Sequence, residues 1–165
     1  SRPLILKSPP HTARIRLLLE LFPDARFIHI HRNPYAIFQS TQHMFRVNLT
    51  LHRLQSYPED DRNDWILRQY RAMYDAFFEQ RPLIPDGRFY ELSYEELEVD
   101  PVGEMRKIYS SLDLPEFEQI KPKLQAYSDS ISGYRKNEHS PLPVNIKNQV
   151  AERWGPCFEE WKYAV

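Results

Sequence analysis

The segment Phe27–Ser40 constrains the fold most strongly, because a strand pattern ends and a helix pattern begins within it. Alternating apolar residues predict a short strand over 26–31, which the sequence Arg32-Asn33-Pro34 then interrupts. Pro34 suits the first turn of a helix, where its missing N–H group is not needed. The segment therefore predicts a strand that turns directly into a helix.

This corner suits a phosphate group. The N–H groups and the positive dipole end of the predicted helix face one place, which favours an anion. Arg32 lies at the corner, and Ser40 lies two turns into the helix. A planar guanidinium can bind two phosphate oxygens, and a hydroxyl can add one more hydrogen bond. This chemistry alone leaves two interpretations about equally supported. The corner is either an anion site, or an ordinary strand followed by a helix with Arg32 in solvent.

Arg32-Asn33-Pro34 followed by Ser40 resembles the 3′-phosphate-binding motif of the sulfotransferase superfamily. The longer stretch Leu4–Ser40 is similar to the same region of the tyrosylprotein sulfotransferases and their bacterial relatives. Enzymes of this superfamily use 3′-phosphoadenosine 5′-phosphosulfate (PAPS) as the sulfuryl donor. The resemblance implies that Arg32 and Ser40 bind the 3′-phosphate of PAPS.

The composition bounds the class of protein. With 165 residues, 41% hydrophobic and 27% charged, the chain is typical of one soluble globular domain. A net charge of −1 argues against a nucleic-acid binder. The single cysteine, Cys157, excludes an internal disulfide and a multi-cysteine metal site. No apolar run reaches the roughly 18 residues of a membrane span, and no signal peptide is visible. We therefore expect a cytoplasmic protein without a transmembrane segment.

The phosphate loop of the superfamily is missing from the sequence. The chain begins at Ser1, directly before a predicted strand, and its four glycines form no Gly-rich loop. The resemblance implies an earlier strand, phosphate loop and helix that hold the 5′-phosphosulfate of PAPS. We expect residues 1–165 to be one sulfotransferase domain without this N-terminal unit. If the phosphate loop is essential, residues 1–165 alone should be inactive.

The residue pattern predicts an α/β protein, in which a parallel sheet of P-loop type lies between flanking helices. Leu4-Ile5-Leu6 predicts a buried strand that ends at Lys7, and a helix over 13–22 follows. With the strand 26–31, these form a β-α-β unit whose right-handed crossover places Lys7 and Arg32 at one edge of the sheet. Ligands of open α/β sheets bind at that edge.

Periodicity and turn residues predict the other elements. Thr12 is the expected N-cap of the first helix. An amphipathic helix with many aromatic residues is expected over 62–80, facing the core. The remaining expectations are helices over 34–47, 101–112 and 116–127, a strand over 88–94, and irregular structure over 128–145.

The resemblance assigns reaction chemistry to Lys7 and His11. Lys7 matches the family lysine that stabilises negative charge on the bridging oxygen as the nucleotide leaves, and a surface lysine is the alternative. A histidine side chain can exchange a proton near neutral pH, so His11 is a candidate base for the acceptor proton. In the cytosolic branch of the superfamily a histidine close to this lysine acts as the base, whereas the tyrosylprotein branch uses an upstream glutamate. A capping or packing role for His11 therefore stays open.

Three further positions resemble nucleotide contacts. The sequence from Ser93 to Pro101 resembles a family segment that follows a sheet strand, and it implies that Tyr94 lies at the adenine side of the nucleotide. A tyrosine with a buried ring and a satisfied hydroxyl is the alternative. Tyr134–Asn137 resembles the late nucleotide-binding loop, which implies phosphate or nucleotide contacts from Arg135 and Lys136.

Arg153 matches a basic position just before the tryptophan that follows that loop. The sequence departs from the family in two places. The interval from Asn145 to Trp154 is longer here, and Met44 stands where those enzymes tend to have an arginine.

His29 and His31 share one face of the predicted strand, and a His-x-His pair can bind zinc. The sequence indicates no third ligand, so we expect no metal.

We predict a PAPS-dependent sulfotransferase that transfers a sulfuryl group to a hydroxyl or amine of a peptide, glycan, lipid or small alcohol. Another P-loop transferase, such as a nucleotide kinase, is one alternative, but it needs a magnesium-binding aspartate that no predicted strand end supplies. The other alternative is a non-catalytic module that binds an anionic glycan or a protein. That module predicts binding that needs no nucleotide and is indifferent to Ser40→Ala.

Overall fold

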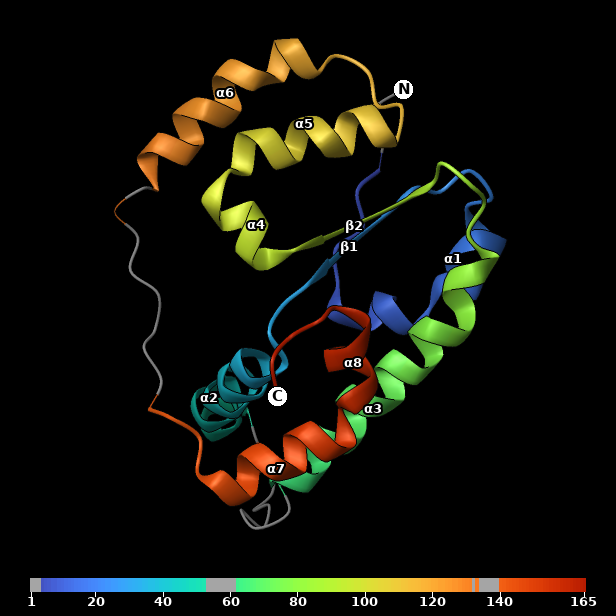
Figure 1. The fold of residues 1–165 in the computed structure, drawn as a ribbon. Coiled ribbons are helices and arrows are strands. Elements are labelled where there is room, and N and C mark those ends of the chain that lie inside the picture. Colours follow the sequence, from blue (N-terminus) through green and yellow to red (C-terminus); the bar gives the residue numbers. More distant parts are fainter. Residues whose placement is uncertain (1–3, 53–61, 132, 134–139) are drawn as a thin grey trace. The chain divides into compact units, whose positions relative to one another are not determined.

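The computed structural model describes residues 4–52, 62–131, 133 and 140–165 (Figure 1). Contacts divide the chain into two compact units, each of which is described by itself. The first unit comprises Ser1–Lys7, Arg14–Arg32 and Gln80–Asn137, and the second comprises Ser8–Ala13, Asn33–Glu79 and Glu138–Val165. The division falls between Arg32 and Asn33, inside the predicted corner.

A parallel pair of strands forms the centre of the first unit. Strand β1 (Phe27–His31) pairs with β2 (Phe89–Ser93), so that Phe27 lies opposite Phe89 and His31 lies opposite Ser93. Figure 1 shows the two strands side by side. The α/β class, the parallel sheet and the predicted strands over 26–31 and 88–94 are thereby confirmed.

The helices of the first unit follow the sequence closely. Asp100 caps α5 by accepting a 2.8 Å hydrogen bond from the Gly103 N–H, and a β-carbon at Gly103 would collide with that carboxylate. Leu92, Ile108 and Leu112 form the buried core beside the strands. The helices are α1 (Ile15–Leu21), α4 (Tyr94–Val99), α5 (Pro101–Ser111) and α6 (Phe117–Ser130), with a 3₁₀ turn at Arg81–Leu83.

The second unit is helical in its described residues. Its elements are a 3₁₀ helix at Pro9–Ala13, α2 (Pro34–His52), α3 (Arg62–Gln80), α7 (Val144–Arg153) and α8 (Gly155–Glu160). The last residue of α3, Gln80, is counted with the first unit. The prediction of a helix over 62–80 is confirmed. The predicted irregular region 128–145 is shorter than expected, because α6 continues to Ser130 and α7 begins at Val144.

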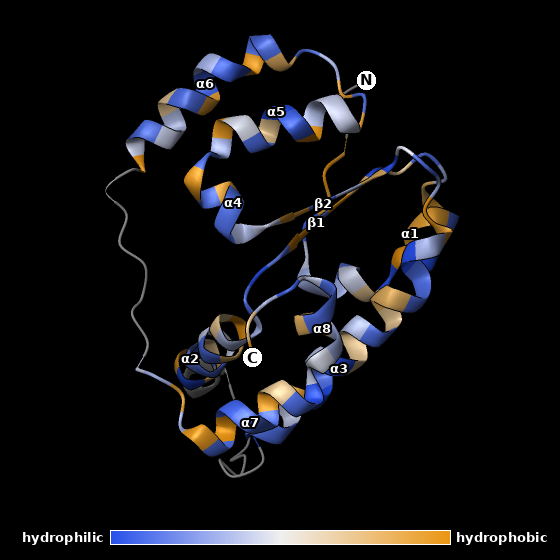
Figure 2. Cartoon of the chain, viewed as in Figure 1, coloured by the Kyte–Doolittle hydropathy of each residue, from blue (hydrophilic) through white to orange (hydrophobic). Residues whose placement is uncertain are grey.

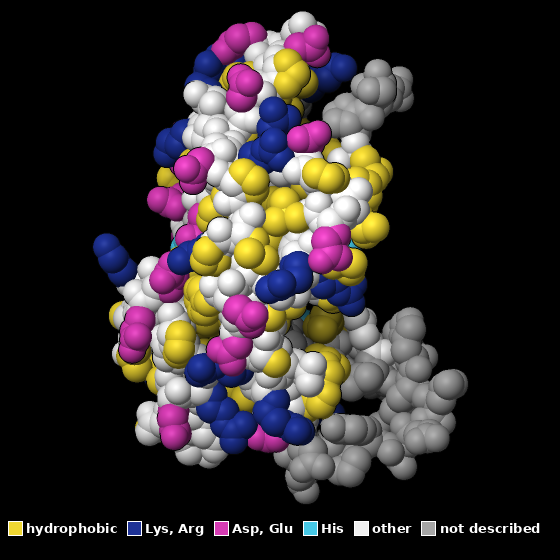
Figure 3. Space-filling view, turned by 90° about the vertical axis from the view of Figure 1, so that its right-hand side faces the viewer, with side chains coloured by type: hydrophobic (Ala, Val, Ile, Leu, Met, Phe, Trp, Pro, Cys, Tyr) yellow, Lys and Arg dark blue, Asp and Glu magenta, His cyan; other side chains and the backbone are white. Residues whose placement is uncertain are grey.

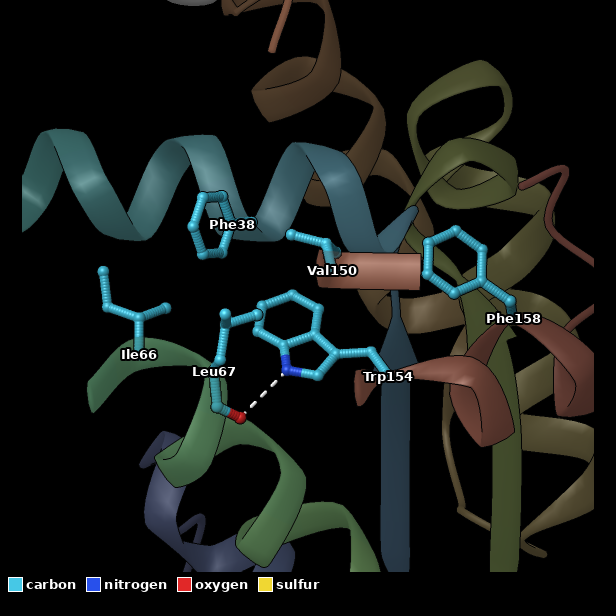
Figure 4. Close-up of a cluster of buried hydrophobic side chains, with 6 residues drawn as sticks. All are labelled: Phe38, Ile66, Leu67, Val150, Trp154 and Phe158. Carbon is cyan, nitrogen blue, oxygen red and sulfur yellow. Dashed lines mark hydrogen bonds between the residues drawn. The ribbon is translucent and has the colours of Figure 1, made fainter. Parts of the chain in front are cut away.

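Trp154 organises the core of the second unit (Figure 4). Its indole is fully buried, and Nε1 donates a 3.0 Å hydrogen bond to the Leu67 carbonyl of α3. The ring stacks on Tyr70 at 3.8 Å between centroids and meets Phe38 of α2 edge to face at 5.7 Å. One side chain therefore joins α2, α3 and α7. The expectation that the aromatic residues of α3 face the core is confirmed except at Trp65, which is exposed.

The predicted strand at Leu4-Ile5-Leu6 is wrong. Residues 4–8 have no regular structure, and the side chains of Leu4 and Ile5 are 71% and 86% exposed. A strand needs a hydrogen-bonded neighbour, and among the described residues β1 pairs with β2 alone. The chain therefore does not form the expected β-α-β unit over residues 4–31.

Thr12 is not the N-cap of a helix. Pro9 and Pro10 begin the 3₁₀ helix that contains Thr12, and the His11 N–H donates to the Ser8 carbonyl at 3.0 Å. Helix α1 begins afterwards at Ile15.

The burial along β1 is the reverse of what its apolar residues indicate. His29 is buried, whereas Ile28 and Ile30 on the other face are 47% and 46% exposed. Figure 2 shows hydrophobic residues along both strands, while α6 is mainly hydrophilic. No helix in the described part of the chain is long and apolar enough to span a membrane.

Replacing Trp154 should destabilise the second unit strongly. Trp154→Ala removes a buried ring and should lower the free energy of unfolding by about 3–5 kcal/mol, while Trp65→Ala, at an exposed ring of α3, should cost much less. Burial raises the pKa of the Cys157 thiol to about 12, so this thiol should react only after unfolding. The measurement is the urea concentration at which Cys157 reacts half-maximally with a maleimide, which should be lower in Trp154→Ala than in Trp65→Ala. Equal urea concentrations for the two variants would contradict the central role of Trp154.

Candidate functional site

Arg32 and Tyr94 come together at the ends of the two strands. His31 and Ser93 are the last paired residues of the two parallel strands. The residues that follow them, Arg32 and Tyr94, therefore lie at the same edge of the sheet. The Arg32 guanidinium carbon lies 4.6 Å from the centroid of the Tyr94 ring, within the range of a cation–π contact. Both residues belong to the first unit and are partly buried. The structure thereby brings together two of the predicted nucleotide contacts.

A capping box fixes the position of Tyr94. The Ser93 hydroxyl accepts a 3.0 Å hydrogen bond from the Glu96 N–H, and the Glu96 carboxylate accepts one from the Ser93 N–H at 3.0 Å. The Ser93 hydroxyl also donates to this carboxylate at 2.8 Å. These bonds lower the pKa of Glu96, because they stabilise its charged form. Tyr94 is therefore held as the first residue of α4.

Arg32 forms no ion pair with the described residues of its own unit. Its contact is with the neutral ring of Tyr94. Other arginines of the unit differ: Arg88 pairs with Asp24 at 3.2 Å, and Arg106 pairs with Glu118 at 2.6 Å. A guanidinium without an ion-pair partner is suited to binding an anion.

The N–H groups at the start of α2 are used within the chain. Asn33 Oδ1 accepts hydrogen bonds from the N–H groups of Tyr35 at 2.9 Å and Ala36 at 3.4 Å. These donors are therefore taken by the side chain that caps the helix, and the expectation that they bind a phosphate needs correction. Ser40 lies on α2 in the second unit, where it is exposed.

Lys7 and His11 lie in different units. Lys7 is exposed and follows the irregular residues 4–6, so the sheet-edge argument for its position does not hold. His11 lies in the 3₁₀ helix of the second unit, and its Nδ1 atom is buried with no hydrogen-bond partner among the described residues. The catalytic roles of both residues rest on the family resemblance.

The remaining predicted nucleotide contacts are not joined to Arg32 by any described interaction. Arg135 and Lys136 lie outside the described residues. Arg153 donates a 2.6 Å hydrogen bond from Nη1 to Asp64, and its carbonyl accepts one from Arg71 at 3.2 Å. A nucleotide contact by Arg153 stays a prediction, and it would compete with the ion pair to Asp64.

His29 and His31 do share one face of β1, with ring centroids 6.4 Å apart. His29 Nδ1 lies 2.9 Å from Glu91 Oε1, and the other oxygen of this carboxylate lies 3.9 Å from Arg81. No group of three metal-ligating side chains occurs in the described part of the chain. The pKa of His31 lies below its usual value, mainly because burial disfavours the charged imidazolium, and the nearby Glu91 carboxylate opposes this shift.

Sequence reasoning did not identify the structural roles of Asn33, Glu91 and Glu96. Two of them have readable signals, because an asparagine before Pro is a common helix cap and Ser-x-x-Glu is the pattern of a capping box. Glu91 has no such signal, since its contact with His29 depends on the register of β1 and β2. On the face shown in Figure 3, basic and acidic side chains both occur along the described part of the chain.

Comparisons with known proteins give a consistent result. The model described as "Sulfotransferase family" matches residues 1–119. Two curated relatives, both named omega-hydroxy-beta-dihydromenaquinone-9 sulfotransferase Stf3, come from Mycobacterium bovis and Mycobacterium tuberculosis. Each is 39% identical over 160 residues, which cover 97% of this chain but 41% of the relative. The chain thus spans less than half the length of these relatives.

A solved structure shows the same fold. The crystal structure of sulfotransferase STF9 from Mycobacterium avium matches 94% of this chain and 41% of its own chain, with a TM-score of 0.76 and 23% sequence identity. The likeness confirms that the chain has the fold of the corresponding part of that structure.

Acidification should destabilise the protein through His31. Because burial lowers the pKa of His31 in the folded chain, the unfolded chain binds the proton more tightly. The free energy of unfolding should therefore fall as the pH drops from about 7.5 through about 6.5 and below. Urea unfolding at several pH values should show a smaller slope for His31→Gln than for the wild type. The exposed His43→Gln is the control, and an unchanged slope in His31→Gln would refute the effect.

Proposed function

The chain belongs to the sulfotransferase family, and on this basis we propose that it forms part of an enzyme that transfers a sulfuryl group from PAPS to an acceptor hydroxyl or amine. The observation that carries the proposal is Arg32 at the end of β1, which lies against the Tyr94 ring and has no carboxylate partner in the described part of its unit. A guanidinium in this state is suited to a phosphate dianion.

Arg32 and Ser40 bind the 3′-phosphate in this proposal. The guanidinium offers several N–H donors in one plane, and the exposed Ser40 hydroxyl offers one more. These donors match the oxygens of a phosphate group, and the motif that joins the two residues supports the pairing. Tyr94 lies at the adenine side, while Arg135, Lys136 and Arg153 supply further contacts to the nucleotide.

Lys7 and His11 serve the transfer itself. PAPS supplies the sulfuryl group. Lys7 places an ammonium charge beside the bridging oxygen and stabilises the negative charge that develops there. His11 is the candidate base for the acceptor proton, and this role is supported by the family resemblance and by the ability of a neutral imidazole to accept a proton.

A hydroxyl is the favoured acceptor. The names of the two curated relatives describe a substrate that carries a hydroxyl group. The identity of 39% over part of those chains supports a hydroxyl acceptor for this chain as well. It does not identify the molecule that carries this hydroxyl. Peptides, glycans, lipids and small alcohols all carry such a group.

Removal of Arg32 should abolish most of the affinity for the nucleotide product. Arg32→Ala removes charge-assisted hydrogen bonds and should weaken binding of 3′-phosphoadenosine 5′-phosphate (PAP) by about ten- to a hundredfold. Isothermal titration should use the complete gene product, because the 165 residues contain no Gly-rich phosphate loop. Arg106→Ala is the matched control, since Arg106 is already paired with Glu118 in the same unit. No binding of PAP by the wild-type protein would refute the proposed function and favour the non-catalytic module.

Loss of Lys7 should affect the rate and spare the affinity. Lys7→Ala should lower the turnover of labelled PAPS with a set of simple alcohols and phenols by about a hundredfold, while the Kd for PAP stays within about threefold. Lys107→Ala, at an exposed lysine paired with Glu104 on α5, is the control. An unchanged turnover in Lys7→Ala would exclude the proposed role.

A further inference from the structure

We infer that Tyr94 acts through Arg32: its ring holds the guanidinium in the orientation that binds the 3′-phosphate, so its contribution to affinity depends on that phosphate. This inference rests on the proposed nucleotide site and assigns Tyr94 a positioning role within it. A direct adenine contact, which the family resemblance implies, is the competing assignment.

The contact itself supports a positioning role. The Arg32 guanidinium lies 4.6 Å from the centroid of the Tyr94 ring, well within the roughly 6 Å range of cation–π contacts. The face of the ring that Arg32 covers is not available for stacking against an adenine. Both residues belong to one compact unit.

The backbone brings both side chains to the same place. Parallel register sets His31 opposite Ser93, and Arg32 and Tyr94 are the residues that follow. The Ser93–Glu96 capping box then fixes Tyr94 at the first position of α4. The Glu96 carboxylate is engaged by the N–H and the hydroxyl of Ser93. Tyr94 thus has a fixed backbone from which to restrain a long, flexible side chain.

This contact uses no hydrogen-bond acceptor. The guanidinium carbon of Arg32 lies over the Tyr94 ring, and a cation–π contact engages the positive charge of the guanidinium with the ring face. Arg32 can therefore keep its contact with Tyr94 while its N–H groups donate to phosphate oxygens. A restrained guanidinium also loses less rotamer freedom on binding, which raises the affinity without any contact between Tyr94 and the nucleotide.

The test compares two nucleotides that differ in the 3′-phosphate. In the complete gene product, Tyr94→Leu should weaken binding of PAP by about three- to thirtyfold. Binding of adenosine 5′-phosphate, which lacks the 3′-phosphate, should stay within about twofold. Tyr94→Phe keeps the aromatic face and should bind PAP with wild-type affinity. In an Arg32→Ala background, Tyr94→Leu should have no further effect on PAP.

Three results would overturn the inference alone. Equal losses for both nucleotides in Tyr94→Leu would show a direct adenine contact, a loss in Tyr94→Phe would assign the role to the hydroxyl, and additive losses with Arg32→Ala would separate the two residues. Failure of the wild-type protein to bind PAP would instead overturn the proposed function together with this inference. Equal urea midpoints for the Phe and Leu variants serve as the folding control.

Discussion

The parallel pairing of β1 with β2 is the constraint on which the candidate site depends. The register sets residues more than sixty positions apart side by side, so that Arg32 meets Tyr94 at the strand ends and His29 meets Glu91 within the sheet. A slip of one residue would move every side chain of a strand to its other face. Leu92 of β2 packs with the buried Ile108 and Leu112, which favours the observed register because this cluster holds the apolar face of β2 in the core.

The second unit depends on a different interaction. Trp154 fills the space between α2, α3 and α7, and its single N–H satisfies the Leu67 carbonyl. Helix α2 begins at the Asn33 cap and carries Ser40, so the hydroxyl of the phosphate motif stands on a helix that this core holds in place. The motif thus takes its charged residue from the end of a strand and its hydroxyl from a helix with its own core.

Sequence reasoning predicted the elements whose cause is local. Periodic apolar residues identified α3 almost to the residue, and the arrangement Arg32-Asn33-Pro34 correctly identified the end of β1 and the start of α2. It did not predict features that need a partner distant in the sequence. Leu4-Ile5-Leu6 has strand-forming residues but no neighbouring strand in the described chain, and the inward position of His29 depends on Glu91 across the sheet. Arg32 and Tyr94 were each predicted to contact the nucleotide, but their mutual contact follows from a register that sequence patterns do not encode.

The central claim is that Arg32, at the end of β1, binds the 3′-phosphate of a nucleotide. A crystal structure of the complete gene product with PAP tests it most directly. Both terminal nitrogens of Arg32 should lie within hydrogen-bond distance of the 3′-phosphate, and the Ser40 hydroxyl should donate to the same group. The guanidinium should still lie over the Tyr94 ring. A nucleotide bound with its 3′-phosphate away from Arg32 would refute this role of Arg32.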